Sequence, residues 1–351
     1  MSRRSCTRAA AVAALAIAVT AQPAQAAAPG DLHSAPLPFL WSRSELLDVA
    51  ADGSSAWVAG YQGAYCVPWV DHCGLYSSGN PVVRRWTGSA WKEYPLQGWS
   101  GQGQIGAVVT APGETWIAGG TIGDSDYYDY LARFDGTAFQ KIEKPSANTL
   151  DMLSTGPAGT WVAQIPPVGS SDPQLFRRTG STWTPAALPA DLRVNDVQAR
   201  TATDVWTVGW NSTSTGGKTL AAAHFDGTTW TRVATPATDD EFVKVLPVAA
   251  NDVYALTWNN LAHWNGTTWT LTPLPQSVDR GADLVRDASG DLWISKGHYP
   301  VVGNLLRYSN NTWHDISVPG TLITDVVVAP GTSTIWGVGR KDDNAAAVTN
   351  S

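Results

Sequence analysis

The chain has 351 residues, a formal net charge of −7, 18 tryptophans and three cysteines. An acidic chain is not attracted to nucleic acids or anionic membrane surfaces, so neither is expected as a partner. The few cysteines can staple a local loop but cannot hold a whole fold together.

The N-terminal segment has the three parts of a secretory signal peptide. Three arginines lie among the first eight residues, an uncharged apolar run covers 9–20, and Ala24-Gln25-Ala26 is a small-residue cleavage site. The apolar run is shorter than the ~20 residues that a membrane span needs. We therefore expect a signal peptide over 1–26, no membrane span, and a secreted, extracellular domain over 27–351.

From residue 46 onward, four short segments recur in a fixed order. The first is an alternating apolar run, the second is centred on an aromatic, the third ends in a turn such as Asp226-Gly227, and the fourth begins with an aromatic. The aromatics of the second segment are Trp57, Trp116, Trp161, Trp206, Tyr254, Trp293 and Trp336. Period-two alternation and Asp-Gly turns indicate strands joined by tight hairpins. Four antiparallel strands about every 45 residues predict an all-β, seven-bladed β-propeller.

The chain ends provide the last blade. The seventh repeat stops after its third strand, and 33–39 ("HSAPLPF") ends like the fourth strands of other repeats. We expect this N-terminal strand to complete the seventh blade and close the ring, which leaves no open seam. The large aromatics should fill the gaps between neighbouring blades, because a single blade cannot bury both of its faces.

A column of basic residues precedes the third-strand turns, and acids precede several second-strand aromatics. Second and third strands are antiparallel neighbours, so we interpret these residues as charge pairs within blades. The predicted pairs are Glu114–Arg133, Asp204–His224, Asp252–His263 and Asp291–Arg307.

The repeat resembles one that is common in secreted actinobacterial proteins, DVWxVG followed by HFDGxxWxxVxxP, here Asp204 to Pro236. The resemblance covers nearly all of 27–351 and implies a propeller without implying an activity. The turn before Trp230 is also similar to the Asp-box of sialidase-type propellers, with one residue fewer between Asp226 and Trp230. The acid–base pairs are similar to the structural Asp–His pairs of WD40 propellers.

Function on a repeat scaffold tends to lie in loops that depart from the repeat. The links from second to third strands are long and unlike one another, and all should emerge on one face together with the links between blades. Aromatics and acids in these links suit the binding of sugars or of protein hot spots, although each aromatic could instead pack its own loop. The candidate ligand-binding residues are Tyr61, Trp69, Trp99, Asp124, Asp126, Tyr127, Tyr128, Asp129, Trp210 and Trp258.

Two features of these links have simple chemical interpretations. Cys66 and Cys73 are most simply a disulfide in an exported protein. Asp124, Asp126 and Asp129 could chelate Ca²⁺, but their segment lacks the glycine and final glutamate of a calcium loop. We therefore expect no cofactor and no metal site.

The sequence favours a non-catalytic binding protein. The leading hypothesis is lectin-like recognition of carbohydrate or a cell-surface polymer, and the alternative is an interaction subunit of a secreted assembly. Catalysis is less favoured, because no Ser–His–Asp order and no phosphate loop stands out. A glycoside hydrolase or lyase is the third hypothesis, in which paired carboxylates would come from Asp71, Asp124, Asp126 and Asp129 on the face that carries these links.

Overall fold

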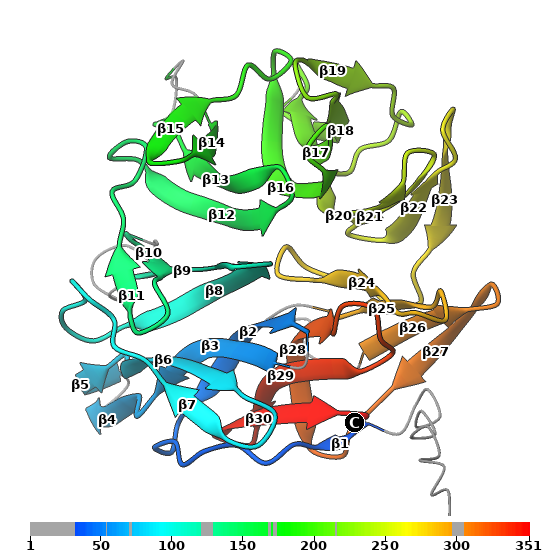
Figure 1. Ribbon diagram of the computed structural model, residues 1–351. Helices are drawn as coiled ribbons and strands as arrows, with labels where there is room; N and C mark the ends of the chain where they lie inside the picture. Colours follow the sequence, from blue (N-terminus) through cyan, green and yellow to red (C-terminus); the bar gives the residue numbers. More distant parts are fainter. Residues whose placement is uncertain are drawn as a thin grey trace, which may run out of the picture.

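A computed structural model describes residues 32–53, 55–69, 72–120, 129–167, 170, 174–214, 216–296 and 305–351. Seven four-stranded antiparallel sheets are arranged in a ring around a central channel, as Figure 1 shows. The predicted seven-bladed β-propeller is therefore confirmed. In the described ranges every regular element is a strand, and none forms a helix that could cross a membrane. The predicted signal peptide lies outside the described residues.

Within each blade, the strands follow one another in chain order from the channel outwards, and only blade 7 takes its outer strand from the N-terminal segment. Blade 1 consists of β2 (Glu45–Asp52), β3 (Ser55–Gln62), β6 (Asn80–Trp86) and β7 (Trp91–Glu93), and blade 2 of β8 (Gln104–Ala111), β9 (Glu114–Gly120), β10 (Tyr130–Phe134) and β11 (Phe139–Lys141). Blade 3 consists of β12 (Thr149–Gly156), β13 (Gly159–Ile165), β14 (Leu175–Thr179) and β15 (Thr182–Pro185), and blade 4 of β16 (Leu192–Thr201), β17 (Asp204–Ser212), β18 (Lys218–Phe225) and β19 (Trp230–Val233). Blade 5 consists of β20 (Phe242–Ala249), β21 (Asp252–Thr257), β22 (Asn260–Trp264) and β23 (Trp269–Pro273), and blade 6 of β24 (Leu284–Arg286), β25 (Leu292–Ile294), β26 (Leu305–Ser309) and β27 (Thr312–Ile316). Blade 7 consists of β28 (Thr321–Val328), β29 (Ile335–Lys341), β30 (Asn344–Thr349) and the N-terminal β1 (His33–Ser34). A separate hairpin, β4 (Tyr65–Trp69) and β5 (His72–Ser77), lies in the link of blade 1.

The N-terminal strand closes the ring as predicted, although it is shorter than the expected 33–39. β1 pairs with β30, and the ladder continues through the Ala35 N–H, which donates to the Ala347 carbonyl at 2.8 Å. Pro36 follows and has no N–H to donate, so the regular strand ends there. Leu37 and Leu40 then pack against the core between blades 7 and 1.

The second-strand aromatics fill the gaps between blades. Trp57, Trp116, Trp161 and Trp293 are among the largest fully buried side chains. Several gaps also receive aromatics from the next blade: Trp161, for example, lies edge-on to Trp230 of blade 4 with ring centroids 5.7 Å apart. Burying each such side chain contributes about 2–3 kcal/mol.

All four predicted charge pairs form. Glu114 lies 3.1 Å from Arg133, Asp204 2.9 Å from His224, and Asp252 2.7 Å from His263, while the Arg307 Nε donates to Asp291 at 2.9 Å. Each base faces the second-strand aromatic of its own blade in the sheet register, as Arg133 faces Trp116. The Glu114–Arg133 and Asp252–His263 pairs are partly exposed, so each contributes only about 0–1 kcal/mol.

Candidate functional site

The antiparallel blades place two kinds of connection at opposite ends of the ring. The tight turns within hairpins lie at one end, here called the turn face. The links from second to third strands and from one blade to the next lie at the other end, here called the link face. This arrangement follows from the strand order within each blade.

Two candidate aromatics of the link face make hydrogen bonds to residues close to them in the structure. The Tyr61 hydroxyl donates to Glu45 at 3.1 Å. The Trp99 indole N–H donates to the Gly101 carbonyl at 2.9 Å, and its ring lies edge-on to Tyr130 with centroids 5.0 Å apart. For Trp99 the packing alternative therefore describes the side chain better than an open platform does.

The structure brings two other candidates, Trp210 and Trp258, into one cluster. The Lys218 ammonium lies over the Trp210 ring, 4.7 Å from its centroid, and also bonds Glu241 at 2.8 Å. The Trp258 indole N–H donates to the same Glu241 oxygen at 3.0 Å. Sequence reasoning named both tryptophans but not the glutamate that connects them.

The remaining candidates of the link face can be placed only in part. The backbone of Trp69 belongs to β4, and nothing is described of its side chain. Asp129 is exposed and pairs with Lys144 at 2.7 Å, whereas Asp124, Asp126, Tyr127 and Tyr128 lie outside the described residues.

The cysteine and calcium expectations both concern this face. The hairpin β4–β5 carries the two cysteines, Cys66 opposite Tyr76 and Cys73 opposite Pro68. Their disulfide stays a prediction, because the side chain of Cys73 is not described. Among the residues that the structure describes, no three His, Cys, Asp or Glu side chains are grouped to hold a metal ion.

Glu241 is the centre of a polar cluster that spans three blades. Its side chain is 3% exposed and accepts bonds from Asn195 and Lys218 of blade 4 and Trp258 of blade 5, while Arg280 of blade 6 lies at 3.6 Å. Burial alone would raise the pKa of Glu241, but the bonds from Lys218 and Asn195 lower it below its ordinary value. Glu241 is therefore a buried, ionised anchor.

A hollow of about 420 Å³ lies beside this anchor, a volume within the range of ligand pockets. We call it the Glu241 pocket. It is lined by Lys218, Asp239, Asp240, Glu241, Trp258, Asn259 and Ser277. Asp239 is exposed, and no partner for its carboxylate occurs among the described residues. The pocket thus combines one aromatic ring with an excess of negative charge.

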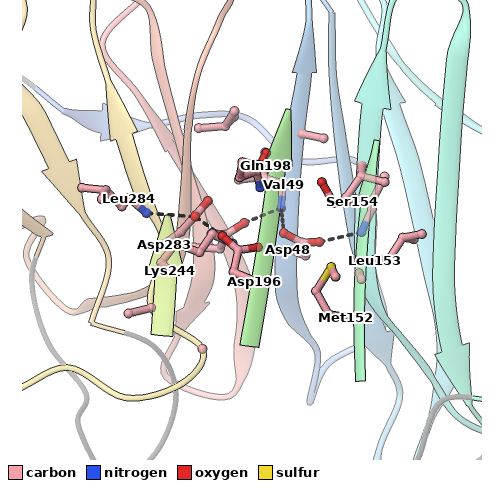
Figure 2. A pocket seen from close by; sticks show the side chains of 18 of the residues that line it. Asp48, Val49, Met152, Leu153, Ser154, Asp196, Gln198, Lys244, Asp283 and Leu284 are labelled. Carbon is pink, nitrogen blue, oxygen red and sulfur yellow. Dashed lines mark hydrogen bonds and ion pairs between the residues drawn. The ribbon is translucent and has the colours of Figure 1, made fainter. Parts of the chain in front are cut away.

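A second cavity, of about 500 Å³, is the central channel. Charged side chains from six blades line it: Asp48, Asp151, Asp196, Lys244, Arg280, Asp283 and Asp325. Figure 2 shows Lys244 between Asp283 and Asp196, and the Lys244 ammonium lies 3.0 Å from Asp283. The sequence carries a signal for this ring, because an aspartate recurs at one position of several first strands, as Asp48, Asp196 and Asp325.

Bulges aim these side chains into the channel. A one-residue register shift precedes Asp48, Asp196, Lys244 and Asp325. At the bulge the two strands approach so closely that a Cβ on Gly209 would lie 1.8 Å from the Arg193 carbonyl oxygen. This approach explains the glycine of the repeated DVWxVG motif.

The channel aspartates also join neighbouring blades. A backbone N–H of the next blade donates to each of three carboxylates: Val49 to Asp325 at 2.8 Å, Val108 to Asp48 at 2.5 Å, and Val245 to Asp196 at 3.0 Å. These bonds satisfy N–H groups at the inner rim of the ring, so the ring carboxylates have a structural use.

The same carboxylates have perturbed ionisation. Burial raises the pKa of Asp325 well above its ordinary value, and the charge of neighbouring Asp48 raises it further. Burial also raises the pKa of Asp48. Burial would lower the pKa of Lys244, but the charges of Asp283 and Asp196 raise it above its ordinary value. The ring therefore holds a firmly protonated lysine beside carboxyls that resist ionisation.

Replacing Asp325 with asparagine should flatten the pH dependence of stability. Because the pKa of Asp325 is higher in the folded state, its contribution is fully present below the unfolded pKa near 3.8 and is lost as the pH rises through the raised value. The amide oxygen of the introduced asparagine would still accept the Val49 N–H. We expect the drop in unfolding free energy from pH 5 to pH 8 to be smaller in Asp325→Asn than in the wild type. Urea unfolding at both pH values measures this, with Asp315→Asn, an exposed site, as the control; equal drops in wild type and Asp325→Asn would contradict it.

The ring, the links gathered on one face and the polar cavities define a β-propeller whose features are those of a binding scaffold. No family model matches the sequence, and no curated protein matches it. Among solved structures, the chain is similar to YCF48 bound to D1 peptide, with a TM-score of 0.57 and 14% identity over 91% of this chain and 96% of that one. It is also similar to YCF48 from Cyanidioschyzon merolae, with a TM-score of 0.55 and 13% identity over 91% of this chain and 98% of that one.

A third similar structure is the extracellular domain of the hybrid two component system BT4673 from B. thetaiotaomicron. Its TM-score is 0.54 with 12% identity, and the match covers 90% of this chain and 39% of that chain. At identities this low, the three likenesses show the propeller fold alone.

Proposed function

We propose that this protein is a secreted, non-catalytic binding propeller that holds a segment of a protein partner at the Glu241 pocket. The observation that carries the proposal is that Trp258 and Asp239 line the same pocket, next to Glu241, whose buried carboxylate is already hydrogen-bonded within the protein. Such an anchor keeps the walls of the pocket in place before a ligand arrives, which lowers the entropic cost of binding.

The chemistry of the pocket favours a basic side chain of the partner. Three acids and one lysine line it, so its net charge is negative. The methylene stem of a lysine or arginine can lie on the Trp258 ring while its charged end reaches Asp239 or Asp240. The likeness to a propeller solved with a bound peptide supports a peptide ligand.

Carbohydrate is the second candidate. Trp258, Asn259, Ser277 and Asp239 together supply a ring face, an amide, a hydroxyl and a carboxylate, which are the groups that hold sugars. Trp210 and Trp99 do not extend this platform, because Lys218 covers one ring and Tyr130 packs against the other.

Arrays of peptides and of glycans distinguish these candidates. We expect residues 27–351 to bind peptides centred on lysine or arginine, more weakly as salt rises. Trp258→Ala and the double change Asp239→Asn, Asp240→Asn should each weaken binding about tenfold, equivalent to ~1.4 kcal/mol. Glu143→Gln, which removes one exposed charge from another link between blades, should bind normally.

Two outcomes decide against the peptide proposal. Saturable glycan binding that is lost in Trp258→Ala would favour the lectin hypothesis. Peptide binding that is unchanged in all of these variants would place the site elsewhere on the molecule.

A further inference from the structure

The acid–base pairs of the blades share a pattern that blades 1 and 3 break. In blade 4, one oxygen of Asp204 accepts bonds from the Trp206 indole at 3.1 Å and from His224 at 2.9 Å. In blade 6, Asp287 accepts the Trp293 indole N–H at 3.0 Å and Asp291 accepts Arg307. One carboxylate thus satisfies both the aromatic N–H and the base in blade 4, and two carboxylates do so in blade 6.

Blade 3 keeps the aromatic and the base but has no acid. Gly159, with a φ of +95°, takes the place of the acid two residues before Trp161. Trp161 is 2% exposed, and its indole N–H has no partner among the described residues. Arg177 donates its Nε to the Ala158 carbonyl at 2.6 Å and lies over the Trp161 ring at 5.4 Å. In the described part of the chain, no carboxylate pairs with its guanidinium.

These donors border a hollow of about 460 Å³ between blades 3 and 4 at the turn face, here called the Arg177 pocket. Its walls are the rings of Trp161, Phe225 and Trp230 with threonine hydroxyls, and none of the described lining residues is acidic. The neighbouring Asp226 bonds the Thr228 and Thr229 N–H groups of its own turn at 2.8 Å each. The pocket therefore presents the Arg177 guanidinium beside aromatic walls, while the Trp161 indole nitrogen is buried beneath the ring surface.

We propose that the Arg177 pocket binds a carboxylate carried on a small apolar group. The carboxylate takes the role that Asp204 has towards His224 in blade 4: it accepts from the Arg177 guanidinium, and the apolar group lies on the aromatic walls. Hydrogen bonds between a guanidinium and a carboxylate are stronger than those between neutral groups, so an acid gains an interaction with Arg177 that its uncharged amide does not. The carboxylate can come from a free organic acid or from the C-terminus of a peptide.

The hollow between blades 1 and 2 provides an internal contrast. There Ser55 replaces the acid, and the Trp57 indole and Arg85 Nε have no partner among the described residues. That hollow is lined by Asp52, Glu114 and Asp135, which repel an anion. The same loss of an acid thus creates an anion site in only one of the two places.

The experiment compares acids with their uncharged amides. The probes are phenylacetate and phenylacetamide, and a short peptide ending in phenylalanine as free acid and as C-terminal amide. Binding to residues 27–351 is followed by calorimetry and by tryptophan fluorescence. We expect at least one acid to bind at least tenfold more tightly than its amide, and Arg177→Gln to abolish this preference. Arg85→Gln, the matched change in blade 1, should leave it intact.

The two pairs of probes also identify the source of the carboxylate. Binding of phenylacetate alone indicates a free organic acid, and binding of the peptide acid alone indicates a partner chain. The proposal is overturned if neither acid is preferred to its amide in the wild type, a result that does not depend on whether a variant folds. It is also overturned if a folded Arg177→Gln, checked by circular dichroism, keeps the preference. Neither outcome bears on the Glu241 pocket, because Asp239 and Asp240 are unchanged.

Discussion

A chain that lacks residues 1–40 should be less stable by about 3–5 kcal/mol than one that begins at residue 27. The deletion removes β1 from blade 7, the Ala35–Ala347 hydrogen bond and the packing of Ala35, Leu37 and Leu40 between blades 7 and 1. Each partly buried leucine contributes about 1–2 kcal/mol and each hydrogen bond about 1 kcal/mol. Urea unfolding followed by tryptophan fluorescence measures the loss.

The same deletion should promote self-association. Without β1, the outer edge of β30 presents unpaired N–H and carbonyl groups, which can pair with another chain. Phe39→Ser is the matched control, because Phe39 is 84% exposed and should be replaceable without loss. If the shortened chain unfolds at the same urea concentration as the chain from residue 27, closure by β1 does not stabilise the ring.

The blades could be predicted because each is a local structure. Its strands follow one another in the chain, its hairpins are short, and its charge pair joins adjacent strands, as Asp252 and His263 do 11 residues apart. Period-two alternation, turn glycines and matched acid and base positions therefore contain nearly all the information needed. Closure was predictable for the same reason, because a missing fourth strand leaves an edge that must be covered.

The sites could be predicted only in part, because they depend on contacts between blades. Glu241 meets Asn195, Trp258 and Arg280 only once the ring has closed and the links have taken their paths. Periodicity does not encode these paths, so Trp99 and Trp258 looked equivalent in the sequence. Both pack partly against the core, but of the two Trp258 also lines the Glu241 pocket. The channel aspartates were visible as a repeated position, but the bulges that turn them inward were not.

Two tryptophans on one strand test this division between repeat and link. Trp206→Ala should cost about 3–5 kcal/mol of unfolding free energy, as is typical of buried aromatics. Trp206 is 3% exposed, lies edge-on to Trp269 of blade 5 with centroids 6.2 Å apart, and donates its indole N–H to Asp204. Its removal leaves a cavity and a buried carboxylate with one bond fewer.

Trp210, four residues further along β17, should behave differently. It is half-buried on the link face, and its described ring contact is the Lys218 ammonium, a partly exposed cation–π contact of about 0.5–1 kcal/mol. Trp210→Ala should therefore cost no more than about 1 kcal/mol, which urea unfolding of the two variants compares directly. A loss as large as that of Trp206→Ala would mean that Trp210 belongs to the hydrophobic core. Because Lys218 contacts both Trp210 and Glu241, the residues around the Glu241 pocket would then serve to stabilise the fold and not to bind a ligand.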